Sequence, residues 1–336
     1  MLNRENIEEL YRETLAAYVK EQSEEVLYKG QQLSRKTIEQ DVAPEEIISW
    51  HKSVLLDLFP ETRSEILDSL DFLLEVMMGY GLAYRENQSL RHFQQELKSE
   101  MDIAANVQNT LLETKIPEVP QLEIGAVSVP AKRMNGDYYH FIQDEENCIG
   151  VGIADVIGKG IPAALCMSMI KYAMDSIPDQ RHEPGNVLKS LNRVVEQNVD
   201  PSMFITMFYG LYNPATAIFS YASAGHEIPM YYSAASGQFE DLYAKGLLLG
   251  INKETNYQQY ERHVQIGDMI ILMSDGVTEC RTDEGFIERE YLVNEINKNI
   301  HLHPKEIVMN VYKHLEKLQH FQLRDDFTMI ILKRVS

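Results

Sequence analysis

Glycine and proline divide this chain into two unlike parts. Only three of the 18 glycines and two of the 12 prolines precede residue 115. Both residues interrupt regular structure, so their scarcity across apolar residues at helical spacing predicts long helices. Pro44 suits the first turn of a helix, and Glu45 and Glu46 behind it suit the positive end of the helix dipole. Residues 1–84 are therefore predicted to form an all-α domain of four helices.

The last of these predicted helices is apolar on two sides. Thr62 and Glu65 form a capping-box pattern at its start. A helix with two apolar sides must be covered on both, and a domain this short offers little cover. We therefore expect a homodimer that packs on this helix, the alternative being that one stripe belongs to the domain's own core. The stripes are Ile66, Leu70, Leu73 and Met77, and Leu67, Leu74 and Met78.

Residues 85–117 are predicted to continue as a mostly polar, coiled-coil-like helical linker. Glutamine and alanine occupy part of its seam, where leucine would be more stable. Such a weak seam fits either a solvated strut or a switchable signalling helix, whose marginal association a partner can bias. The residues at heptad spacing are Leu90, Leu97, Ala104 and Leu111, with Gln94, Met101 and Gln108 between them.

From residue 118 onward the pattern changes to short β-rich runs. Helical patterns interrupt them over residues 163–176, 187–197 and 305–319. Because strand follows strand in several places, residues 118–336 are predicted to form an α+β domain with largely antiparallel sheets. The expected strands are LEIGAV, CIGVGIAD, MFITMFYGLY, AIFSYA, DMIILMS and FTMIIL.

The charge balance limits the kinds of partner. The formal net charge is -20, which disfavours a nucleic-acid partner because phosphate binding needs clustered lysine and arginine. The same charge repels a phosphorylated substrate, so phosphate chemistry on this chain would require bound cations to invert the local field.

The cysteines and the chain start bear on the compartment. Cys148, Cys166 and Cys280 are far apart and form no CxxC motif, which is typical of reduced thiols. The first residues lack the apolar core of a leader peptide. No run approaches the ~18 apolar residues of a membrane helix. We expect a cytoplasmic protein without a membrane partner.

Aspartates stand at the ends of several predicted strands. Asp137 enters one strand, Asp155 and Asp275 each end another, and Asp325 and Asp326 precede FTMIIL. Alone, each is an ordinary turn residue. If they converge, the carboxylates would repel and raise each other's pKa, a cost that hard divalent cations relieve. We therefore predict two Mg²⁺ or Mn²⁺ ions, which at about 3.5–4 Å separation could activate a water for in-line attack on a phosphoryl group.

A series of motifs across residues 122–334 carries a family resemblance. They resemble the PPM/PP2C phosphatases, and within these the SpoIIE/RsbU branch. The whole chain, with its helical front and linker, is similar to the stress-response phosphatases of this branch from Bacillus relatives. The resemblance implies an antiparallel β-sandwich flanked by helices and a metal-dependent protein serine/threonine phosphatase. The motifs are PAKRMNGDYYHF, IADVIGKGIPAAL, FITMFYGLY, YASAGHEIPMYY, GLLLGI, GDMIILMSDGVTECR and RDDFTMIIL.

The resemblance also implies roles for individual residues. Asp155 would bridge both ions, with the carbonyl of Val156 beside it. Asp137 would bind one ion, and Asp275 with Asp325 the other. Asp155 and Asp137 would then be the catalytic residues, acting through the water that the ions activate.

Several positions stay open in this comparison. We favour Asp325 as the direct ligand because the family motif starts there, and Asp326 is then a supporting residue. The common GGDxYD motif reads NGDYYH here, which places Asn135 for glycine and His140 for aspartate. His226 could be a general acid, although a turn histidine that shapes the site is favoured.

Partners follow from the same resemblance. The substrate would be a phosphorylated anti-anti-sigma factor (RsbV-like), whose dephosphorylation activates the general stress sigma factor. A switch kinase (RsbT-like) would bind residues 1–84, and the linker would transmit this binding to helix 163–176. The alternative is a catalytically inactive adaptor that binds a phosphoprotein, which the intact set of acidic residues argues against.

Overall fold

The structure is a computed structural model that describes residues 4–156, 160–176, 183–200, 203–282 and 285–336. It divides into two compact units, Met1–Ser99 and Glu100–Ser336. Apolar side chains are buried in both units, and most of them lie in the second.

The first unit is entirely helical, as predicted. Helix α1 packs against α2 and α3, and Ile7, Leu33 and Val54 are buried among them. Pro44 is the first residue of α3, where its missing N–H leaves no helical hydrogen bond unmade. The helices are α1 (Arg4–Lys20), α2 (Glu24–Glu39), α3 (Pro44–Leu58) and the first part of α4 (Ser64–Leu112).

The start of α4 differs from the predicted capping box. The hydroxyl of Thr62 donates to the carbonyl of Phe59 at 2.6 Å, so it bonds back into the preceding turn. Glu65 lies against Arg63, at 3.2 Å. The helix begins at Ser64 and is uninterrupted to Leu112, through most of the segment predicted as a linker.

The two apolar stripes of α4 are only partly covered within the first unit. An uncovered apolar face is what a homodimer would need, and the homodimer stays a prediction. Half-buried side chains are Leu67, Leu70, Leu74 and Met77, and exposed ones are Ile66, Leu73 and Met78.

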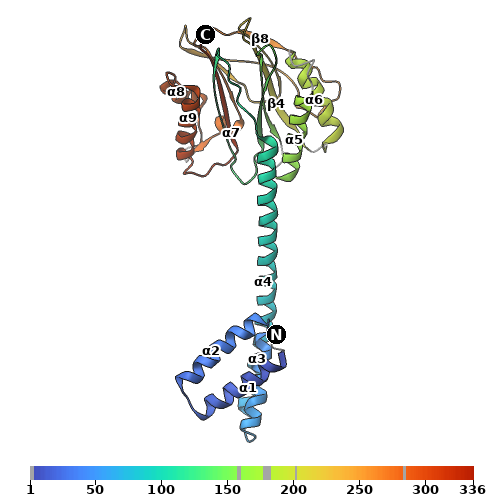
Figure 1. The fold of residues 1–336 in the computed structure, drawn as a ribbon, viewed down its shortest axis with the longest axis vertical. Helices are drawn as coiled ribbons and strands as arrows, with labels where there is room; N and C mark the ends of the chain where they lie inside the picture. Colours follow the sequence, from blue (N-terminus) through green and yellow to red (C-terminus); the bar gives the residue numbers. More distant parts are fainter. Residues whose placement is uncertain (1–3, 157–159, 177–182, 201–202, 283–284) are drawn as a thin grey trace. The chain divides into compact units, whose positions relative to one another are not determined.

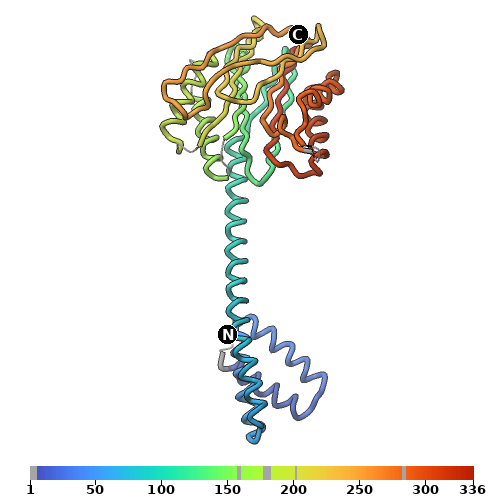
Figure 2. Tube along the Cα trace, turned by 180° about the vertical axis from the view of Figure 1, so that it is seen from behind, coloured from blue at the N-terminus to red at the C-terminus, as the bar shows by residue number. Residues whose placement is uncertain are grey.

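The second unit is built on two five-stranded antiparallel sheets, in agreement with the predicted α+β class. One sheet has the order β1-β12-β9-β6-β7 and the other β2-β3-β4-β5-β8, with β10 and β11 as a separate ribbon. The first sheet pairs β1 with β12, which are far apart in sequence (Figure 2). The strands are β1 (Leu122–Val129), β2 (Asp137–Gln143), β3 (Ile149–Val156), β4 (Ile205–Asn213), β5 (Ile218–Ala224), β6 (Met230–Ser233), β7 (Gln238–Asp241), β8 (Tyr260–His263), β9 (Met269–Met273), β10 (Arg281–Thr282), β11 (Gly285–Phe286) and β12 (Phe327–Arg334).

Helices cover the outer face of each sheet. Figure 1 shows α5 and α6 on one side of the paired sheets, and α8 and α9 on the opposite side. A third apolar cluster, with Phe208, Ile270 and Ile330, fills the space between the sheets. Most of the strands are therefore buried on both faces, which explains why they read as continuous apolar runs, whereas the edge strands β7 and β8 alternate between exposed and half-buried residues. The helices are α5 (Ile161–Asp175), α6 (Pro184–Asn198), α7 (Asp275–Thr278), α8 (Arg289–Lys298) and α9 (Pro304–Leu318).

Across the described ranges, no helix combines the length and the apolar character that crossing a bilayer requires.

Close packing of α9 on β1 depends on Gly125. A Cβ at this position would lie 2.3 Å from the carbonyl carbon of Pro304, so Gly125→Ala must push the start of α9 away. We expect the free energy of unfolding of the second unit to fall by about 1–3 kcal/mol, measured by chemical denaturation. Gly30→Ala is the matched control, because a Cβ there meets nothing within 4 Å. Equal stability of Gly125→Ala and the parent chain would contradict this packing.

Candidate metal centre

Strand pairing brings the first two predicted ligands together. Asp137 opens β2 and Asp155 lies next to the last residue of β3, and the two are directly paired in the antiparallel register. Side chains of directly paired residues lie on the same face of a sheet, with Cβ atoms about 4.5–5.5 Å apart. The register alone therefore places two carboxylates side by side.

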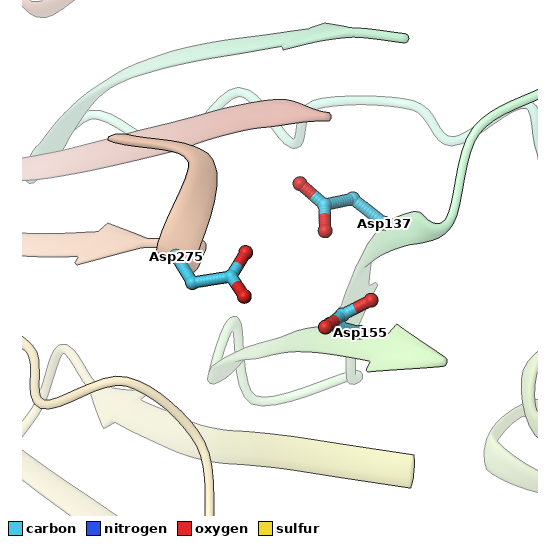
Figure 3. Close-up of side chains that lie close together, drawn as sticks. All are labelled: Asp137, Asp155 and Asp275. Carbon is cyan, nitrogen blue, oxygen red and sulfur yellow. The ribbon is translucent and has the colours of Figure 1, made fainter. Parts of the chain in front are cut away.

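The third carboxylate comes from the other sheet. Asp275 follows β9 and is the first residue of the short helix α7. Ligand oxygens of Asp137, Asp155 and Asp275 all lie within 4.8 Å of one another. In Figure 3 the three carboxylates point into one common space. The site thus lies where the ends of the two sheets meet.

Burial of Asp137 makes its charge costly. The residue is 3% exposed, and its Oδ2 has no hydrogen-bond partner among the described residues. Loss of solvation raises the pKa of Asp137 well above its ordinary value, and the charges of Asp155 and Asp326 raise it further. Hydrogen bonds from Ser274 and Thr328 act in the opposite direction. A buried carboxylate oxygen without a donor is the position that a cation would fill.

The carboxylate of Asp275 is partly removed from solvent and, like that of Asp137, lies near other negative charges. Its pKa is raised by burial first, and then by the charges of Asp325 and Glu279. Asp325 therefore lies near enough to act on Asp275, although it is outside the close group of three.

Asp326 is held by backbone groups. Its Oδ1 accepts from the N–H of Ala131 at 2.7 Å, and its Oδ2 accepts from the N–H of Gly136. Both oxygens of this buried side chain are therefore engaged in fixing the loop before Asp137. Val156, whose carbonyl was expected beside the ions, ends β3 and donates its N–H to the carbonyl of Gly136 at 3.1 Å.

Gly276 allows the two ligand-bearing turns to approach. A Cβ on Gly276 would lie 2.1 Å from the carbonyl oxygen of Asp326. Only glycine lets the backbone behind Asp275 come this close to the turn that carries Asp325 and Asp326.

Glu227 is a residue near the site that no sequence pattern predicted. This half-buried residue follows β5, and burial raises its pKa, with the charges of Asp275 and Glu279 adding to the rise and Arg289 opposing it. Glu227 therefore lies near Asp275. No strand-end pattern marks Glu227, because it stands in a loop beyond its strand.

His226 supports the strand that carries Asp155. Its Nδ1 lies 2.9 Å from the hydroxyl of Thr206, and Thr206 pairs with Asp155 across β3 and β4. Burial lowers the pKa of His226 to about 4, so the ring is neutral at about pH 7, where a general acid must carry a proton. The geometry favours the turn-shaping role over the acid.

The donor set fits a hard divalent cation. Within the described residues, the close group consists of carboxylates alone. Oxygen ligands of this kind suit Mg²⁺ and Mn²⁺, whereas zinc sites usually include histidine or cysteine. Together with the unpartnered oxygen of Asp137, this chemistry makes the three aspartates a suitable cation site.

Two family models match the chain. The model described as Stage II sporulation protein E (SpoIIE) matches residues 145–335. The model described as Phosphoserine phosphatase RsbU, N-terminal domain, matches residues 9–83.

Solved structures agree on the fold of the second unit. The SiaA-PP2C domain of Pseudomonas aeruginosa is similar at a TM-score of 0.60 with 16% identity, over 72% of this chain and 98% of that one. The catalytic domain of the serine/threonine phosphatase PstP, solved with two manganese ions, is similar at a TM-score of 0.50 with 15% identity. The match covers 64% of this chain and 99% of the PstP domain.

One curated relative extends along nearly the whole chain. Phosphoserine phosphatase RsbU of Bacillus subtilis (strain 168) is 59% identical over 331 residues, which is 98% of each protein. The aligned residues therefore include both units of this chain. The chain therefore belongs to the RsbU family of PP2C-type phosphoserine phosphatases.

Proposed function

We propose that this chain is a cytoplasmic phosphatase that dephosphorylates an RsbV-like anti-anti-sigma factor and so activates the general stress sigma factor. The observation that carries the chemistry is the convergence of Asp137, Asp155 and Asp275 in a chain of the RsbU family. The second candidate, an inactive phosphoprotein-binding adaptor, is disfavoured because clustered carboxylates repel one another, and an adaptor has no use for such a cluster.

Two Mn²⁺ or Mg²⁺ ions are the proposed cofactors. Asp155 is assigned to both ions, with the Val156 carbonyl beside it, Asp137 to one ion and Asp275 with Asp325 to the other. The two manganese ions of the PstP catalytic domain and the carboxylate-only donor set support this assignment. When bound, such ions supply a water of lowered pKa and neutralise phosphoryl charge.

The residues of the chain supply geometry to this reaction. Pairing of β2 with β3 holds Asp137 and Asp155 at fixed separation, and the short helix α7 presents Asp275 from the other sheet. Engagement of both Asp326 oxygens by backbone N–H groups supports Asp325 as the direct ligand and Asp326 as the residue that holds the loop.

The first unit is proposed to form the homodimer and to receive an RsbT-like switch kinase. The match of residues 9–83 to the RsbU N-terminal domain supports a regulatory role. Apolar side chains that stand exposed on α4, such as Phe72 at 74% and Val76 at 50%, support a partner surface, because contiguous exposed apolar area marks interaction sites.

Asp155→Asn tests the proposed chemistry. The amide keeps the shape of the side chain but removes the charge assigned to both ions, so phosphate release from a phosphorylated RsbV-like protein in Mn²⁺ should fall by at least about a hundredfold. Glu145→Gln is the matched control, since this exposed carboxylate lies in the turn after β2. Full turnover of Asp155→Asn with an unchanged melting temperature would refute the assignment.

Asp137→Asn should stabilise the metal-free chain. The folded-state pKa of Asp137 is raised, so the folded state holds a proton that the unfolded chain releases above about pH 4. Stability is therefore lost as the pH rises from about 4 through the raised pKa, and asparagine, which does not titrate, avoids that loss.

In EDTA at about pH 7, the melting temperature of Asp137→Asn should exceed that of the parent chain by at least about 2 °C. The difference should shrink toward about pH 4. Added Mn²⁺ should raise the melting temperature of the parent chain more than that of the variant. A variant that melts below the parent in EDTA at both pH values would contradict this account of the site.

Deletion of residues 1–84 tests the regulatory proposal. The second unit has its own apolar core, so the shortened chain should retain Mn²⁺-dependent phosphate release within about threefold of the full chain, a difference under 1 kcal/mol. Stimulation by an RsbT-like kinase should disappear. Stimulation that persists without these helices would show that the activator binds elsewhere.

A further inference from the structure

The last turns of α4 are packed into the second unit. Met101, Ala104 and Ala105 contact Met134 and Ala164 in one apolar cluster. Gln108 is 2% exposed, although its neighbours Asn106, Val107 and Asn109 are exposed. A buried glutamine must be hydrogen-bonded to be tolerated, so its partners define what this part of the helix does.

Both ends of the Gln108 amide bond to one residue. Its Nε2 donates to the carbonyl of Asn135 at 2.8 Å, and its Oε1 accepts from the N–H of Asn135 at 3.1 Å. The side chain thus pairs with the backbone of Asn135 as a neighbouring strand would. Two simultaneous bonds fix both the position and the orientation of that residue.

The side chain of Asn135 continues the connection to the site. Its Oδ1 accepts from the N–H of Asp137 at 3.0 Å. Its Nδ2 donates to the hydroxyl of Ser128 at 2.8 Å, and Ser128 lies 2.9 Å from the hydroxyl of Thr328. Asn135 therefore connects α4 on one side with the backbone of Asp137 and with the β1–β12 pair on the other.

Close packing is incomplete on this side of the loop. A cavity of about 270 Å³ is lined by Gln108, Asn135 and Asp137, together with Ser128 and Tyr139. Because side chains do not fill this space, packing does not restrain the loop before Asp137 on this side. The two hydrogen bonds from Gln108 supply that restraint.

We propose that Gln108 and Asn135 are positioning residues for Asp137, and that they set the metal affinity of the site. This inference rests on the proposed function, since it assumes that Asp137 binds a cation. Neither residue touches the ions or the substrate; each acts through the backbone that carries Asp137. The helix that precedes the catalytic fold is thus a component of its active site.

Gln108→Met tests the proposal in the full chain. Methionine has a similar length and can fill the same space beside Met167, but it makes neither bond to Asn135. We expect the affinity for Mn²⁺, measured by titration calorimetry without substrate, to fall about tenfold, as for partners that orient metal ligands. Turnover at saturating Mn²⁺ should recover to within about threefold of the parent chain, a pattern that loss of folding would not give.

Asn106→Met is the matched control, because it places the same side chain on the exposed face of the same helix. Asn135→Ala is the second variant and should also weaken Mn²⁺ binding. Since the two residues act through one connection, the double variant should lose less affinity than the product of the single losses.

The outcomes separate this inference from the function on which it rests. If the parent chain binds no Mn²⁺, the proposed function fails, and this inference fails with it. If the parent chain binds Mn²⁺ and Asp155→Asn does not, but Gln108→Met binds as tightly as the parent, only the positioning role is overturned. Independent losses in the double variant would also overturn it.

Discussion

The pairing of Asp137 with Asp155 across β2 and β3 is the constraint on which the rest of this site depends. A one-residue slip in register would turn one of the two side chains to the other face of the sheet. Because the register is set by a core of buried apolar strands, the protein forces two like charges together, and the carboxylate of Asp137 is almost fully buried. The third carboxylate, on Asp275, follows a strand of the other sheet and adds a further negative charge to the site. Bound cations, as proposed for this site, would stabilise such an arrangement.

Residues around the site fix the positions of the backbone segments that carry these aspartates. Asp326 uses both carboxylate oxygens to fix the loop before Asp137, and Gly276 allows the Asp275 turn to lie against the Asp326 backbone. Gln108 holds the same loop from the side of α4. Two segments far apart in sequence, the turn that carries Asp326 and the end of α4, thus converge on one short loop, and the Asp275 turn lies against the first of them.

Much of the fold and of the metal site could be predicted from the sequence, because the strongest sequence signals are local. Apolar runs ending in aspartate predicted β3 and β9 together with Asp155 and Asp275, and the scarcity of glycine and proline predicted the helical front. Contacts between distant segments could not be predicted. The heptad spacing of Gln108 suggested a coiled-coil seam, yet its bonds to Asn135 depend on how α4 meets the second unit. Glu227 was missed for the same reason, because its place near Asp275 depends on tertiary contacts. The predicted capping box failed for a local reason, since the hydroxyl of Thr62 bonds back to the carbonyl of Phe59 in the preceding turn.

The central claim is that the three aspartates bind cations, and anomalous diffraction from crystals grown with Mn²⁺ tests it most directly. The account predicts manganese peaks in the space between Asp137, Asp155 and Asp275, with a carboxylate oxygen of each within about 2.0–2.3 Å of a metal. The absence of any manganese peak there, with these carboxylates ordered and turned apart, would contradict it.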